Sequence, residues 1–200
     1  VAVTEIDGQR AYSNEASRYQ RIMLLNTFDI TKPYVVDVMR VTGGQTHDYV
    51  FHGSIRYDST FECSFPLATN ASPYPMLEGS EVWSEPTSSG DSFPYYGFWR
   101  NVSSNKAPGN FQITYRDTGS ANRDTRLWMT DDGTAQVHIG RTPVPARANG
   151  EPADWWVNGF WRPSAIIRKR ITSGTLSNLF VSVIEPVTNG VSVIQNVERL

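Results

Sequence analysis

Apolar and polar residues alternate along many short stretches of this chain, and we find no convincing amphipathic helical pattern. Alternation with a period of two residues is typical of β-strands that are buried on one face. It predicts strands at residues 1–6, 18–26, 34–41, 47–51, 54–65, 98–102, 111–116, 125–129, 134–140, 165–171, 179–185 and 190–197. We therefore expect about ten to thirteen short strands and no substantial helix. Short strands separated by turn residues indicate an all-β antiparallel sandwich or barrel.

The stretch 34–41 has the clearest alternation, and residues 33–53 form the segment around which we expect the domain to be organised. One face of its first strand carries Val35, Asp37, Met39 and Val41. Gly43 and Gly44 supply the positive φ angles of a tight turn, so residues 33–53 predict a β-hairpin. Asp131-Asp132-Gly133 predicts a second hairpin turn, whereas residues 66–97 read as a long irregular connection that packs in part on the domain.

Length and charge narrow the class of protein. The 200 residues are expected to form a single domain, residues 1–200. A formal net charge of −2 gives no basic surface for nucleic acid or an anionic membrane, and no apolar run approaches the roughly 18 residues that span a bilayer. We expect no partner of either kind. Because the chain starts at Val1 without a methionine or a signal peptide, we expect it to be a fragment or a processed product.

Three histidines and one cysteine limit the metal chemistry available to this sequence. Cys63 is single, which excludes an internal disulfide and a cysteine zinc cluster. His47 and His52 are five residues apart, so a continuous strand places them on opposite faces, and His138 lies in a separate strand. We therefore expect hydrogen bonds for these imidazoles and no metal site or cofactor on this chain. No Gly-x-Ser-x-Gly elbow is present for a hydrolase.

Two aromatic clusters with neighbouring arginines are candidates for sugar binding, since sugar rings stack on flat side chains and Arg binds carboxylates. The competing interpretation, a packing role for the same rings, stays open. The short run Arg168-Lys169-Arg170 reads as a solvated strand edge. No catalytic residue is assigned. The candidate substrate-binding residues are Trp155, Trp156, Trp161, Arg162, Tyr96, Trp99, Arg100, His47 and His52.

Several segments occur in an order found in a known family. They are residues 18–25, 34–44 and 47–53, followed by 126–129, 141–143, 168–170 and 180–186. In this succession the chain resembles the C-terminal β-domain of heparinase II/III-like polysaccharide lyases. The resemblance implies an antiparallel supersandwich like that of the galactose mutarotase-like group, preceded in the parent protein by an N-terminal α/α toroid.

The same resemblance implies an activity for the parent protein. Such lyases cleave polysaccharides that contain uronic acid by β-elimination, and we expect a secreted or periplasmic bacterial protein. The family's His-x-His and His-Asn segments would lie before Val1. The chain alone is therefore expected to be inactive, and zinc, if the parent binds it, is not expected from this chain. A free-standing carbohydrate-binding module and a structural assembly domain are the alternatives.

Overall fold

The computed structural model describes residues 1–12, 14–55, 57–83, 95–119, 123–144 and 161–198. Within them lie twelve strands and one short 3₁₀ helix, η1 (Tyr95–Phe98). The strands are β1 (Ala2–Asp7), β2 (Arg18–Asn26), β3 (Tyr34–Thr42), β4 (Thr46–His52), β5 (Ser59–Cys63), β6 (Ala68–Thr69), β7 (Arg100–Lys106), β8 (Phe111–Asp117), β9 (Arg123–Thr130), β10 (Gln136–Pro143), β11 (Trp161–Arg170) and β12 (Ser177–Thr188).

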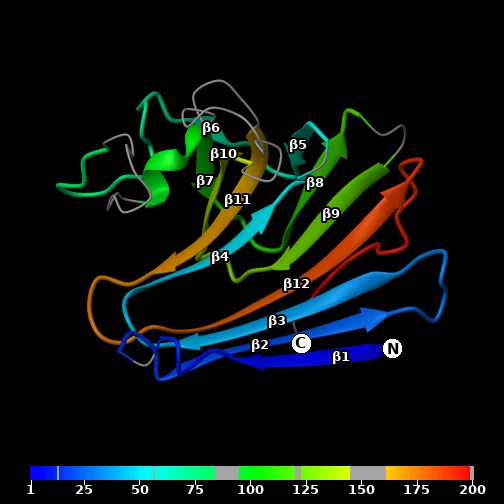
Figure 1. Ribbon diagram of the computed structural model, residues 1–200, viewed down its shortest axis with the longest axis horizontal. Coiled ribbons are helices and arrows are strands. Elements are labelled where there is room, and N and C mark those ends of the chain that lie inside the picture. Colours follow the sequence, from blue (N-terminus) through cyan, green and yellow to red (C-terminus); the bar gives the residue numbers. More distant parts are fainter. Residues whose placement is uncertain (13, 56, 84–94, 120–122, 145–160, 199–200) are drawn as a thin grey trace, which may run out of the picture.

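The strands form two antiparallel sheets (Figure 1). The seven-stranded sheet has the order β1-β2-β3-β12-β9-β8-β5, and the five-stranded sheet has the order β4-β11-β10-β7-β6. For the described residues, the prediction of an all-β antiparallel sandwich with ten to thirteen strands and no substantial helix is confirmed.

The main hydrophobic core is built from alternate residues of strands in both sheets, as period-two alternation requires. In β3 the predicted alternation is confirmed, because Asp37, Met39 and Val41 are buried while Arg40 is exposed, and the structure shows that the face of Asp37 points inward. Other members of this core are Tyr49, Phe111, Ile113, Tyr115, Leu127, Met129, Val137, Ile139, Ala165, Ile167 and Phe180. A smaller apolar cluster consists of Met76, Trp99, Val102 and Ile166, with Tyr96 packed against it. Met76 thus shows that part of the long connection between residues 66 and 97 packs on the domain, as predicted.

Both predicted hairpins are wrong in their pairing. Gly43 and Gly44 do have positive φ angles, but β3 pairs with β2 and β12 while β4 pairs with β11 in the other sheet. The Gly-Gly segment instead exchanges backbone hydrogen bonds with Leu176. The turn at Gly133 likewise joins β9 of one sheet to β10 of the other. The glycines thus form turns as predicted, but each turn connects a strand of one sheet to a strand of the other.

Two predicted strands also differ from the structure. Tyr95–Phe98 is a 3₁₀ helix, closed by a hydrogen bond from Trp99 N to Tyr96 O, and β7 starts only at Arg100. Residues 192–198 contain no strand, although 190–197 alternate in sequence. There the buried Glu185 carboxylate accepts hydrogen bonds from Ser192 Oγ, Val193 N and Ile194 N. These backbone donors are therefore satisfied by a side chain and have no strand partner.

Candidate functional site

A groove lies where the ends of β7, β10 and β11 approach β5. It consists of two adjoining cavities of about 510 and 720 Å³, which share Arg100, Asn101 and Arg141. We call this the arginine groove. The first cavity adds Asp58, Ser59, Thr60, Thr118 and Trp161 to its lining, and the second adds Phe61, Thr69, Asn70, Ala71, Ser72, Pro73, Tyr74 and Ser103.

An irregularity in the sheet places the two arginines of the groove beside each other. The β7–β10 register shifts between Ile139 and Arg141, so that Arg141 pairs directly with Arg100. Asn101, next to Arg100, has a φ of 51°, which is the left-handed region that residues other than glycine rarely adopt. Bulges and strained residues of this kind are over-represented next to functional sites.

The Arg100 guanidinium is held by several contacts. Its Nη1 donates to the carbonyl oxygens of Gly97 and Trp99, and its Cζ lies 4.6 Å from the Tyr74 ring centroid and 5.3 Å from that of Trp83. Planar guanidinium groups stack on aromatic rings in this way. Arg141 differs, because it forms no ion pair within the described part of the chain. The groove therefore contains one fixed cation and one that forms no ion pair with any residue the structure describes.

The structure brings only some of the predicted sugar-binding residues to this groove. Trp161 and Arg100 line it, and Arg162 follows Trp161 at the start of β11. Trp99 is only 2% exposed and packs in the smaller apolar cluster, so its ring is not accessible for stacking on a sugar. Trp155 and Trp156 lie outside the described residues.

The histidines are separated, as their spacing predicted. His47 is buried at the β3–β4 connection, where its Nε2 lies 2.5 Å from Gly43 O and its Nδ1 lies 3.2 Å from Asn178 Nδ2. Nδ1 of His52 lies 2.7 Å from Ser164 Oγ. Burial lowers the pKa of His52 to about 4, and the Arg162 cation adds to this effect. His47 and His52 thus have the predicted hydrogen-bond partners, and neither lines the arginine groove. For His138 the prediction is wrong at Nε2, which is buried without a hydrogen-bond partner among the described residues.

The run Arg168-Lys169-Arg170 was interpreted wrongly as a solvated edge. β11 lies inside its sheet, between β4 and β10, and Arg168 is only 7% exposed. Its guanidinium contacts both oxygens of Asp48, at 2.8 and 2.7 Å, and reaches Glu78 at 2.5 Å. The hydroxyl of Tyr96, another predicted site residue, donates to Asp48. This charged cluster ties residues near η1 to the sheet, and the sequence pattern did not reveal it.

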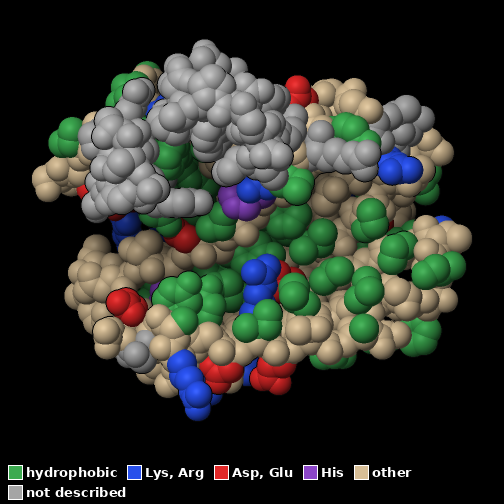
Figure 2. Space-filling model, in the orientation of Figure 1, with side chains coloured by type: hydrophobic (Ala, Val, Ile, Leu, Met, Phe, Trp, Pro, Cys, Tyr) green, Lys and Arg blue, Asp and Glu red, His purple; other side chains and the backbone are tan. Residues whose placement is uncertain are grey.

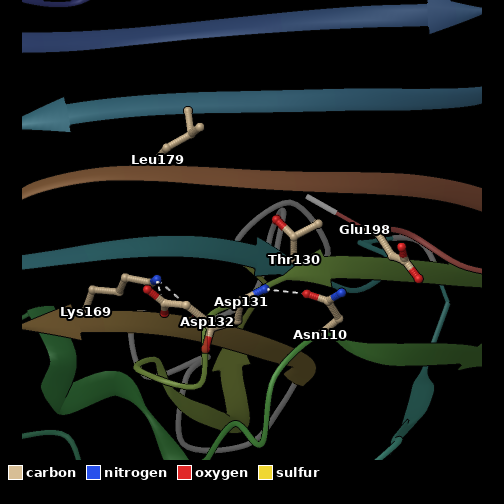
Figure 3. A pocket seen from close by; sticks show the side chains of 7 residues that line it. All are labelled: Asn110, Thr130, Asp131, Asp132, Lys169, Leu179 and Glu198. Carbon is tan, nitrogen blue, oxygen red and sulfur yellow. Dashed lines mark hydrogen bonds and ion pairs between the residues drawn. The ribbon is translucent and has the colours of Figure 1, made fainter. Parts of the chain in front are cut away.

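A third cavity, of about 580 Å³, lies beside the β9–β10 turn (Figure 3). Its cation is Lys169, whose Nζ lies 2.9 Å from both Asp131 Oδ1 and Asp132 Oδ1. Asp131 also closes the turn, since its Oδ2 accepts hydrogen bonds from Gly133 N and Ala135 N. The Lys169 cation of this cavity is therefore already paired with two carboxylates, and Glu198 adds a further negative charge to the lining, which makes the cavity a weaker candidate for an acidic sugar than the arginine groove.

Comparisons with known proteins found no matching family model, curated protein or solved structure. Within the described residues, no group of three or more His, Cys, Asp or Glu side chains is placed to hold a metal ion. Among the same residues, no helix has the length and apolar character needed to cross a membrane.

Proposed function

We propose that this chain is the β-sandwich domain of a heparinase II/III-like polysaccharide lyase, and that its arginine groove binds uronate-containing polysaccharide. The observation that carries this proposal is the direct pairing of Arg100 with Arg141 in a groove that Trp161 and Tyr74 also line. Like charges opposite each other on neighbouring strands are destabilising, so a bound anion would relieve their repulsion.

A uronate chain matches both kinds of side chain in the groove. Its carboxylate suits a guanidinium, which binds carboxylates through two parallel hydrogen bonds. The apolar faces of its sugar rings suit Trp161 and Tyr74. Arg141 forms no ion pair among the described residues, so an acidic chain offers it a carboxylate that a neutral glycan lacks, and we propose selectivity for acidic chains.

Calorimetric titration of the chain with oligogalacturonate, and with maltohexaose as a neutral control, tests the groove. Arg141→Gln should weaken oligogalacturonate binding at least about tenfold, because a charge-assisted hydrogen bond contributes roughly 1.5–3 kcal/mol. Arg123→Gln removes an exposed arginine at the start of β9 and should leave affinity unchanged. Equal affinity for the two glycans, or equal loss in the two variants, would overturn the groove assignment.

The place of this domain in a lyase is tested separately. On this proposal the chain supports the substrate cleft, the coding sequence before Val1 encodes a helical toroid with a His-x-His segment, and the parent enzyme is secreted or periplasmic. The 200-residue chain alone should release no ultraviolet-absorbing unsaturated products from any polyuronate. Oligogalacturonate binding without an encoded toroid would favour a free-standing carbohydrate-binding module.

A further inference from the structure

A small pocket, separate from the arginine groove, lies between the β1–β2 connection and strands β2, β3 and β4. Its volume is about 190 Å³, and we call it the Tyr12 pocket. It is lined by Tyr12, Glu15, Ala16, Tyr19, Met39, Val41, Gly43, Gly44, Thr46, His47 and Asp48. Figure 2 shows hydrophobic side chains gathered over β1 to β3 on the drawn face of the molecule.

The β1–β2 connection that forms one wall is held by backbone contacts. Glu15 N and Ala16 N both donate to Tyr12 O, at 3.0 and 2.7 Å, and Ser17 N donates to Thr42 O at 2.8 Å. The connection also lies directly against Gly43, since a Cβ added there would be 2.3 Å from Glu15 O. The wall is therefore organised before any ligand arrives.

The lining combines an aromatic wall, an apolar floor and a carboxylate. The Tyr12 and Tyr19 rings have centroids 4.6 Å apart, and Tyr12 is 47% exposed, which leaves ring surface for a ligand. Ala16, Met39 and Val41 belong to the hydrophobic core. Glu15 is exposed and has no ion-pair partner within the described residues.

Asp48, His47 and Thr46, which also line the pocket, already have partners. Asp48 is paired with Arg168 at 2.7 Å, and both nitrogens of His47 have hydrogen-bond partners. Within the lining, the Glu15 carboxylate and the electron-rich faces of the tyrosine rings attract a cation. Cations also lie against this lining, since the charge of Arg21 acts on Tyr19 and Arg170 Nε donates to Thr46 Oγ1.

We propose that the Tyr12 pocket binds an alkylammonium group, that is, a primary ammonium on a short apolar chain. The alkyl chain contacts Ala16, Met39 and Val41, while the ammonium lies over Tyr12 and beside Glu15. An anion would meet the Glu15 carboxylate at the entrance, and an uncharged apolar ligand would gain nothing from it. This site is independent of the proposed polysaccharide groove, and either assignment can fail without the other.

The test is an NMR titration of the ¹⁵N-labelled chain with butylammonium chloride, against 1-butanol and sodium chloride as matched controls. Butylammonium should produce saturable amide shifts at Tyr12, Glu15, Ala16 and Gly44, with a dissociation constant in the millimolar range. Equal shifts with butanol or with sodium chloride, or shifts that do not saturate, would overturn the proposal.

Two variants make the test specific to the pocket. Glu15→Gln and Tyr12→Leu should each weaken butylammonium binding about two- to fivefold, which is the range for an exposed ion pair or cation–π contact. Glu5→Gln changes an exposed carboxylate on β1 and should have no effect. A blocked Gly-Lys-Gly peptide that competes for the same shifts would show that the pocket accepts the lysine side chain of a protein, and a lack of competition would restrict the pocket to free amines.

Discussion

Arg21 of β2 and Asp37 of β3 form an ion pair at the inner face of the sandwich, with Arg21 Nη2 2.5 Å from Asp37 Oδ2 and Nε 2.9 Å from Oδ1. The Asp37 side chain has no solvent exposure, and it also accepts a 2.8 Å hydrogen bond from the Tyr49 hydroxyl. The hydrogen bond between Arg21 and Asp37 is the main cause that raises the pKa of Arg21, so Arg21 stays positively charged at all ordinary pH values. Asp37 thus brings a negative charge into the core that Arg21 must balance.

Removal of the cation should therefore destabilise the fold. We expect Arg21→Met to lower the free energy of unfolding by about 2–3 kcal/mol, below the roughly 3–5 kcal/mol for a fully buried pair because solvent reaches Arg21. Arg18→Met, at the exposed start of the same strand, should change it by less than about 0.5 kcal/mol. Urea denaturation measures both, and similar losses in the two variants would contradict the role assigned to this ion pair.

The cluster around Arg168 offers two carboxylates whose contributions should differ because their exposures differ. Asp48 is 10% exposed and contacts the guanidinium through both oxygens, whereas Glu78 is 46% exposed. Asp48→Asn should lower the free energy of unfolding by about 3 kcal/mol, and Glu78→Gln by less than about 1 kcal/mol. Denaturation at low and high salt measures the contrast. A larger loss for Glu78→Gln would show that exposure does not control these two interactions.

Gly43 and Gly44 provide a matched pair for the β3–β4 connection. Both have positive φ angles, of 135° and 59°. A Cβ at Gly43 would lie 2.3 Å from Glu15 O and 2.6 Å from Ala16 Cα, whereas the nearest atom to a Cβ at Gly44 is 4.0 Å away. Gly43→Ala should therefore lower the free energy of unfolding by about 3 kcal/mol, from strain and overpacking together, and Gly44→Ala by about 1 kcal/mol. Thermal or urea unfolding distinguishes them, and equal losses would place the β1–β2 connection away from Gly43.

The sequence pattern predicted local structure well, because alternation and turn residues act over a few positions. The alternation of faces along β3 and the positive φ angles at Gly43 and Gly44 follow directly from residue type. The partner of each strand does not. Alternation in residues 34–41 and 47–51 is the same whether the strands pair with each other or lie in opposite sheets, so the predicted hairpin became a connection between layers.

The candidate sites depend on the same long-range information. Arg100 and Arg141 meet because of a register shift between β7 and β10. Gly140 lies in that shift and is a local signal for an irregularity, but it does not reveal that β7 is the partner strand. The burial of Arg168 follows from the central position of β11, which a short basic run does not indicate. The alternating β-branched residues in 190–197 predict a strand. In the structure the Glu185 carboxylate accepts hydrogen bonds from the backbone N–H groups of Val193 and Ile194, which a partner strand would otherwise bind.

His138 should make the stability of the fold depend on pH. Burial lowers its pKa from 6.5 to about 4, and the Arg168 cation acts in the same direction, against the opposing effect of the Asp48 and Glu78 carboxylates. Between about pH 6.5 and 4 the unfolded chain therefore binds a proton at His138 that the folded chain does not. The stabilising contribution of the neutral His138 side chain is complete above pH 6.5 and is lost as the pH falls toward 4.

The substitution His138→Phe keeps a ring and removes the titrating group. We expect the loss of unfolding free energy between pH 7 and pH 4.5 to be about 1–2 kcal/mol smaller in this variant, discounted for partial exposure to solvent. Urea denaturation at several pH values measures this difference, and identical pH profiles for the two proteins would show that His138 is protonated equally in the folded and unfolded chains.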